Sequence, residues 1–239
     1  ANTALANTSG VTFAGDLTIT GNTTIRKKTV VNYTPSTTDN AAIYIASANT
    51  QGGTGYADFL KVSNIAGGTN PNKTFRLNST GGIEIVNSAY SAVLATIDDT
   101  GRITTPYQPM VYAIKNAGGW ANYGGGTTFV FNSAPTNVGN NYNTSTGVFT
   151  CPIAGYYKVI VTMLLGYGAG TSGYYLMKNG SAYGAGSYSA VYSTSVHKCV
   201  TMSWIVNASA SDTFLVQAWS GNANIFEQGY NSLVIELIG

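Results

Sequence analysis

The most marked shortage in this 239-residue chain is charge, with 11 basic and 9 acidic side chains making up 8% of the residues. That is about a third of the usual share, so the surface is unlike that of an average soluble enzyme. A net charge of +2 gives no electrostatic reason to expect nucleic acid or an anionic membrane as partner. The longest apolar run, Val159 to Leu165, contains Thr162 and is far below the roughly 20 residues of a membrane helix, so we expect no membrane insertion.

Leader-like segments are also missing from the printed start of the sequence. No charged-then-apolar stretch opens the chain, and we therefore expect no secretory signal. The first residues, Ala1-Asn2-Thr3, are compatible with a fragment of a longer protein.

Residues that carry catalysis or bind metals are scarce. The single histidine, His197, falls inside a predicted strand and has no serine elbow or Cys–His partner in the sequence. The adjacent Asp98 and Asp99 precede Thr100-Gly101, which favours a turn over a pair of catalytic carboxylates. No zinc or calcium spacing is present. We predict no catalytic residue, no metal and no cofactor.

Three alternatives remain open at this stage. A distant pair such as Glu227 and Glu236 could still meet in a groove, as a polysaccharide-cutting tailspike enzyme would require. One residue per chain could also build an ion site on a symmetry axis. The two cysteines, Cys151 and Cys199, could pair, although free buried thiols are the favoured reading.

Turn-forming and strand-forming residues dominate what is present. Gly, Asn, Ser and Thr favour turns and Val, Ile, Thr and Tyr favour strands, and no segment keeps helical apolar spacing, so the chain is predicted to be all-β. The composition changes near Pro106: residues 1–105 hold 13 of the 20 charges but only 4 of the 17 tyrosines. We place a domain boundary there, between 1–105 and 106–239.

The first region is thinly apolar. From Val11 to Ile25 the apolar residues occupy odd positions, which predicts short strands with one apolar face. Ile83 to Val86 and Val93 to Ile97 are also strand-like. Because nothing nearby could cover such faces, we expect a fibrous β shaft wound from several copies of the chain, followed by a small β domain; an ordinary small β domain is the alternative.

The second region predicts eight strands with Gly-rich turns, the pattern of a jelly roll or related sandwich. Asn179-Gly180 is a strong hairpin signal. The expected strands are Met110 to Lys115, Thr127 to Phe131, Gly147 to Cys151, Tyr156 to Leu165, Tyr174 to Lys178, Val196 to Val206, Asp212 to Trp219 and Ser232 to Ile238.

The strands expected at Tyr156 to Leu165 and Ser232 to Ile238 carry apolar residues on both faces. A strand that faces its own core on one side and a neighbouring copy on the other would have this composition. We therefore predict an interface between copies of the chain that includes Tyr156, Ile160, Leu164, Val234 and Ile238.

A spaced set of residues in the second region resembles the signature of the complement C1q globular head. The matching positions are Phe131, Asn137, Tyr142, Phe149, Gly155 and Tyr157, while Val159 and Val161 replace two aromatics of that family. The resemblance covers about residues 110–239 and implies a ten-stranded jelly roll that assembles as a trimer, as in the related tumour necrosis factors.

The first region is similar to segments that recur in bacteriophage tail fibres. These segments are Asn70 to Asn87 and Gly15 to Gly21. Together with a trimeric head, they imply a viral fibre that ends in a receptor-binding knob, located at the tail-fibre tip of the virion, attached to the rest of the tail and assembled in the bacterial cytoplasm.

A Tyr-rich and Gly-rich stretch from Gly166 to Ser195 is the best candidate for binding. Tyrosine presents a large amphipathic face with few torsions to freeze, and Gly and Ser let loops adapt. Such loops suit a bacterial surface receptor, either a glycan or a protein. The alternative function is an extracellular complement-like lectin or adhesion protein of a cellular organism. The candidate receptor contacts are Tyr167, Tyr174, Tyr175, Tyr183, Tyr188 and Tyr192.

Overall fold

The computed structural model describes residues 55–64, 67–116, 118–166, 168–184, 191–193, 197–218 and 223–239. Within these ranges the secondary structure consists of β-strands and one short 3-10 helix, η1 (Val138–Asn140), which confirms the all-β prediction. The strands expected between Val11 and Ile25 lie outside the described residues, so the fibrous shaft stays a prediction.

Residues 57–104 form a five-stranded antiparallel meander. Its strands, in spatial order, are β1 (Ala57–Ser63), β2 (Asn72–Leu77), β3 (Ile83–Val86), β4 (Val93–Ile97) and β5 (Ile103–Thr104). Strands β3 and β4 coincide with the two strand-like runs of the sequence. The turn between β4 and β5 is closed by the amide of Gly101, which donates to the carbonyl of Asp98 at 2.9 Å with a φ of 84° at the glycine.

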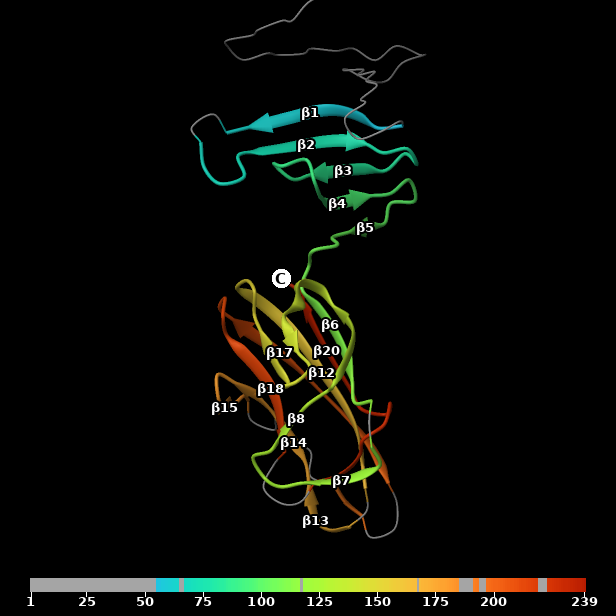
Figure 1. Cartoon of the computed structure of the whole chain (residues 1–239), viewed down its shortest axis with the longest axis vertical. Helices are drawn as coiled ribbons and strands as arrows, with labels where there is room; N and C mark the ends of the chain where they lie inside the picture. The colour runs from blue at the N-terminus through green and yellow to red at the C-terminus, as the bar shows by residue number, and fades with distance from the viewer. Residues whose placement is uncertain are drawn as a thin grey trace, which may run out of the picture. The chain divides into compact units, whose positions relative to one another are not determined.

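The head, after the connector 105–109, is built from two main antiparallel sheets (Figure 1). The seven-stranded sheet contains β7 (Trp120–Tyr123), β19 (Ala223–Phe226), β12 (Gly155–Leu165), β20 (Ser232–Leu237), β6 (Met110–Ile114) and β9 (Ser133–Asn137), with β17 (Lys198–Ala208) also paired to β12. The six-stranded sheet contains β10 (Tyr142–Asn143), β11 (Val148–Thr150), β18 (Thr213–Ala218), β14 (Tyr174–Lys178) and β15 (Ser181–Ala182), with β8 (Thr128–Phe129) paired to β18. A separate pair joins β13 (Gly168–Ser172) and β16 (Val191–Ser193).

All eight strands predicted for the head are present. The described residues contain further short strands that the sequence did not indicate, so the head has more than the ten strands that the C1q resemblance implied. The extra strands are two to five residues long. Some, such as β7 with β19, pair with sequence-distant segments, whereas β10 and β15 pair with their neighbours β11 and β14. The connector at Pro106 separates segments that share no sheet, and the boundary placed there stays a prediction.

The Asn179-Gly180 pair forms the predicted tight turn. Asn179 and Gly180 have φ angles of 51° and 76°, and they join β14 to β15 through the cross-strand pair Lys178–Ser181. Positive φ at both central residues is the geometry of a type I′ turn, which Asn-Gly favours.

The core of the head lies between the two main sheets. On β12 the residues Tyr157, Val159, Val161, Met163 and Leu165 are at most 1% exposed, as the period-two pattern predicted. They pack with buried aromatics from the opposite sheet in a single apolar cluster. The alternate residues of β12 therefore point away from this core, onto the outer face of the seven-stranded sheet.

Candidate functional site

The six residues of the spaced signature meet in and around the head core. Phe149 contacts Tyr157 with ring centroids 5.7 Å apart and pairs with Tyr142 across β10 and β11. The amide of Phe131 donates to the Tyr142 hydroxyl at 3.0 Å, and the Asn137 side chain bonds both the carbonyl and the amide of Tyr142. These contacts give the signature a structural meaning, since it fixes how the two sheets pack.

Glycine in the signature is required by a close approach of the chain. A Cβ on Gly155 would lie 2.5 Å from the carbonyl oxygen of Gly239 and 2.7 Å from a methyl of Leu237. Both neighbours belong to the C-terminal segment, so the glycine lets that segment lie against the start of β12.

The predicted trimer residues lie together on the outer face of the seven-stranded sheet. Ile160 is directly opposite Val234 on β20, and Val234 is opposite Tyr112 on β6. Tyr156 and Ile238 are 51% and 48% exposed, and Ile160, Leu164 and Val234 are partly buried. The structure thus brings the five residues onto one surface and leaves it without a cover within the described residues.

Three further large side chains belong to this face and were not identified from the sequence. Met110 and Tyr112 on β6 are 42% and 39% exposed, and Ile205 on β17 is 62% exposed. The period-two pattern of β6 would have revealed the first two. Ile205 is harder to find, because its neighbours on the outward side of β17 are mainly polar. We call the eight residues the outer apolar face: Met110, Tyr112, Tyr156, Ile160, Leu164, Ile205, Val234 and Ile238.

One ion pair interrupts the outer apolar face. Lys158 and Glu236 are cross-strand neighbours, and the Lys158 Nζ lies 3.1 Å from the Glu236 Oε1. Both side chains are a third or more exposed, so the pair contributes little by itself in the isolated chain. Its charges are matched within one chain, so this surface could be covered without leaving an unpaired charge.

Tyr174 is not a receptor contact, contrary to the sequence-based prediction. Its side chain is fully buried, and its hydroxyl donates to the carbonyls of Val161 and Val200 at 3.0 and 2.9 Å. Burial raises the pKa of this phenol well above its usual value. The reason is the alternation of β14, which turns Tyr174 toward the core and Tyr175 away from it, as expected for one of the two.

The structure describes the side chains of only two of the remaining candidate tyrosines. Tyr175 is partly exposed and its hydroxyl donates to the Gln217 Oε1 at 3.0 Å. Tyr183 is also partly exposed, and part of its ring packs against the head core. Tyr167 and Tyr188 lie outside the described residues, and only the backbone of Tyr192, in β16, is described.

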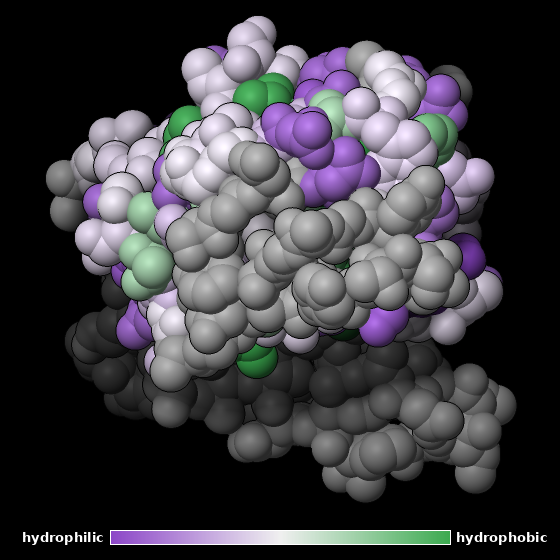
Figure 2. Space-filling view, turned by 90° about the horizontal axis from the view of Figure 1, so that it is seen from below, coloured by the Kyte–Doolittle hydropathy of each residue, from purple (hydrophilic) through white to green (hydrophobic). Residues whose placement is uncertain are grey.

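A second aromatic cluster occupies the end of the head that carries β7 and was not predicted. Trp120 stacks on His197 with ring centroids 4.3 Å apart and contacts Phe226 at 5.0 Å, and Phe226 in turn contacts Tyr230. His197 precedes β17 instead of lying within a strand, and it is exposed. Among the coloured residues of Figure 2, which views the molecule from this side, hydrophobic ones form small separate spots.

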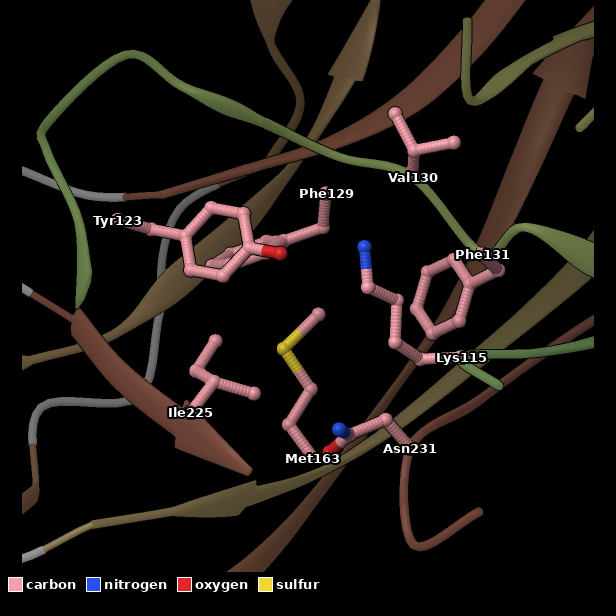
Figure 3. Close-up of a pocket in the computed structure, with 8 residues that line it drawn as sticks. All are labelled: Lys115, Tyr123, Phe129, Val130, Phe131, Met163, Ile225 and Asn231. Carbon is pink, nitrogen blue, oxygen red and sulfur yellow. The ribbon is translucent and has the colours of Figure 1, made fainter. Parts of the chain in front are cut away.

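Beneath this end lies a small internal cavity (Figure 3). Lys115, Tyr123 and Asn231 contribute its polar lining, and its volume of about 10 Å³ has room for about one water molecule. The Lys115 Nζ lies 3.3 Å from the Glu227 Oε1, and the Tyr123 hydroxyl donates to the same carboxylate. Burial, followed by this hydrogen bond, raises the pKa of Tyr123. The cavity is too small for a ligand. Its polar side chains have partners, since Lys115 and Tyr123 bind Glu227 and the Asn231 side chain bonds the backbone of Leu164 and Phe226.

Three of the carboxylates considered for catalysis, Asp98, Glu227 and Glu236, have structural partners. Asp98 accepts hydrogen bonds from Thr100 and Arg102, which hold the pKa of its carboxyl well below its usual value and confirm the turn reading. Glu227 and Glu236, left open as a pair, are each bound to a different lysine. Within the described ranges no cluster of His, Cys, Asp and Glu could hold a metal ion.

The cysteines are free thiols, as favoured from the sequence, but only one is buried. Burial raises the pKa of Cys151 to about 12. Cys199 is exposed, because it lies on β17 opposite Leu164, on the outward side of the sheet. The described part of the chain contains no helix with the length and hydropathy of a membrane span.

Comparisons with known proteins concern the head. A family model described as the C1q domain matches residues 118–234. Among solved structures, the globular domain of zebrafish complement 1qA protein is 15% identical, with a TM-score of 0.43, and the match covers 55% of this chain and 98% of that one. The Eiger TNF of S. frugiperda is 16% identical, with a TM-score of 0.46 and coverage of 55% and 93%. No curated protein matches the chain.

The family match includes all six signature residues, and in the structure those residues build the junction between the two sheets of the head. Over residues 118–234 the head is therefore similar to the C1q domain, and it has a jelly-roll-like fold of two packed β-sheets.

Proposed function

We propose that this chain is the homotrimeric, non-enzymatic receptor-binding tip of a bacteriophage tail fibre, which attaches the virion to a receptor on the bacterial surface. The observation that carries the proposal is the outer apolar face of the head. A large apolar surface on a monomer usually marks an interface.

A threefold assembly is the arrangement that suits this face. Each copy carries the same surface, and the row Tyr112, Val234 and Ile160 crosses three adjacent strands at its centre. Two sister copies around a common axis would cover it, and the C1q domain match supports this mode of assembly.

The receptor contacts belong to the tyrosine and tryptophan side chains that stay accessible. Tyr175 and Tyr183 are the described members of the predicted set, and Trp120 and Tyr230, 42% and 61% exposed, extend it. The low charge of the chain suits stacking and hydrogen bonding to a glycan or protein surface more than salt-dependent attraction. Three heads on one fibre would add avidity to weak single contacts.

The viral setting rests on the similarity of Asn70 to Asn87 and Gly15 to Gly21 to tail-fibre segments. In this proposal the chain lies at the tail-fibre tip of the virion. Its partners are two further copies of itself, the rest of the tail and the bacterial receptor. Its function involves neither catalysis nor a cofactor.

Two measurements test the proposal. Sedimentation should give roughly 75 kDa, three times the 24.9 kDa of one chain. Fluorescently labelled protein should adsorb to some strains of a bacterial panel and not to others, and should release no reducing ends from their capsular or lipopolysaccharide glycans. A monomeric mass would remove the assembly, uniform absence of adsorption would remove the receptor role, and glycan turnover would favour a tailspike enzyme.

The alternative, an extracellular adhesion protein or lectin of a cellular organism, is favoured by the C1q domain match alone. It predicts adsorption to animal cells or their glycans and none to the bacterial panel. Asn78-Ser79-Thr80 has the Asn-x-Ser/Thr pattern that can carry a glycan in a secreted protein. The site is poorly placed for this, because the Asn78 Nδ2 donates to the Glu84 Oε1 at 2.9 Å. A glycan on that nitrogen would disrupt the bond.

A further inference from the structure

The five-stranded sheet β1–β5 has an apolar face that is uncovered. Leu77, Ile83, Ile97 and Ile103 are directly opposite one another on four consecutive strands, so they form one continuous row across the sheet. Their exposed fractions are 42%, 41%, 45% and 70%. Leu60 and Val62 on β1 belong to the same side and are 50% and 52% exposed. We call these six residues the sheet's apolar face.

The opposite face of the same sheet carries a buried ion pair. Arg76 and Glu84 are 8% and 7% exposed, and the Arg76 Nε lies 2.7 Å from the Glu84 Oε2. The Tyr90 hydroxyl accepts from Arg76 and donates to Asp58, and the Arg76 guanidinium lies 4.3 Å from the centre of the Tyr56 ring. The loop after β3 therefore supplies the cover for the charged side.

This distribution of buried and exposed residues is the reverse of that in a domain that is stable on its own. A sheet with one solvated face normally buries its aliphatic side and exposes its charges. Here the chain uses its own loop to cover an ion pair, and it leaves six large aliphatic residues in contact with water. Such a sheet needs a partner that supplies apolar surface without charge.

We infer that the sheet's apolar face packs against the same face of the other copies of this chain, so that the small β domain is a second self-association surface besides the head. The six residues carry no charge, and Lys73, which lies opposite Val62 on the same side, donates to the carbonyls of Asn70 and Asn72. The identical face of a second copy therefore supplies the apolar surface that this face requires. The exposure is greatest at Ile103 on the two-residue edge strand β5, where a single sheet offers least cover.

Chain connectivity favours the same occupant. Five residues, 105–109, join this sheet to the head, and fully extended they span at most about 18 Å. If three heads associate, three sheets are held at high effective concentration, so even a modest interface would be populated. The number of copies rests on the threefold head proposed above, whereas the need for a cover rests on the sheet itself.

Cysteine cross-linking tests the inference in the full chain. In a Cys199→Ser background, which removes the exposed native thiol, Ile103→Cys and Ile97→Cys place a thiol on the sheet's apolar face. Thr104→Cys is the matched control, because Thr104 is exposed, adjacent in β5 and on the opposite face. A short bis-maleimide should link chains covalently through positions 103 and 97 at least tenfold more than through position 104, and those two thiols should react slowly with a maleimide-polyethylene glycol.

The other outcomes overturn the inference in distinguishable ways. A mass of three chains with rapid labelling and no cross-links at positions 97 and 103 would leave the head assembly intact and refute the interface in the sheet. Slow labelling without cross-links would mean that residues 1–54 of the same chain cover the face. A monomeric mass with rapid labelling would refute this interface and the trimer of the head together.

Discussion

Truncation of Ile205 offers a direct measure of how much the outer apolar face contributes to assembly. Its side chain is 62% exposed in the single chain, so Ile205→Ala should change the stability of an isolated head by only a few tenths of a kcal/mol. Full burial of an isoleucine side chain contributes about 1.5–3 kcal/mol, and covering the exposed 62% would contribute about 1–2 kcal/mol per chain. Over three chains this is about 3–6 kcal/mol, or a factor of about 10² to 10⁴ in the dissociation constant.

The assay is sedimentation equilibrium or mass photometry over a dilution series. Ile205→Ala should dissociate at markedly higher protein concentration than the unchanged chain, with similar circular dichroism. Ile153→Ala is the matched control, since Ile153 is 48% exposed in the turn before β12 and lies outside the outer apolar face. Equal dissociation of both variants, or no change in either, would refute the assignment of this face to the interface.

Three further predictions concern the head. Tyr174→Phe should lower the free energy of unfolding in urea by about 1–2 kcal/mol, because two strand carbonyls lose a buried donor. The same variant should leave bacterial adsorption unchanged. Weaker adsorption at unchanged stability would show that Tyr174 is a receptor contact after all. Hydrogen bonds from Asn179 and Ser209 lower the pKa of Asp212 to about 2, so its stabilising effect should be complete above pH 4 and fade as the pH falls toward 2. Asp212→Asn should remove that part of the pH dependence in acid unfolding curves, and an unchanged curve would contradict it. Tyr183→Ala should weaken adsorption to a susceptible strain while the sedimented mass stays constant, and undiminished adsorption would exclude this ring as a contact.

Local pattern was enough to predict the strands that carry the head core. On β12 and β20 the apolar residues recur at every second position, and burial follows that period because successive side chains point to opposite faces. The Asn179-Gly180 turn was equally readable, since two consecutive positive φ angles are favourable for few residue pairs.

Local pattern failed where the partner of a residue is distant in the chain. Tyr174 and Tyr175 are chemically identical neighbours, and only the pairing of β14 with β18 decides which of them faces the core. Trp120 and His197 are 77 positions apart by their residue numbers, and no local feature of either segment predicts that their rings stack. Cys199 was expected to be buried, but its position on the outward side of β17 exposes it.

For the part of the chain that the structure describes, the sequence by itself determined that the fold is all-β and where most long strands lie. It also determined that some strands are apolar on more than their core side. It did so because these properties depend on residues two or four positions apart. Only the tertiary structure decided which of those apolar sides stay uncovered, since the rows Tyr112–Val234–Ile160 and Leu77–Ile83–Ile97–Ile103 exist only once strands from different parts of the chain pair in register. Register is set by burial and turn geometry acting over the whole sheet, and no single segment contains that information.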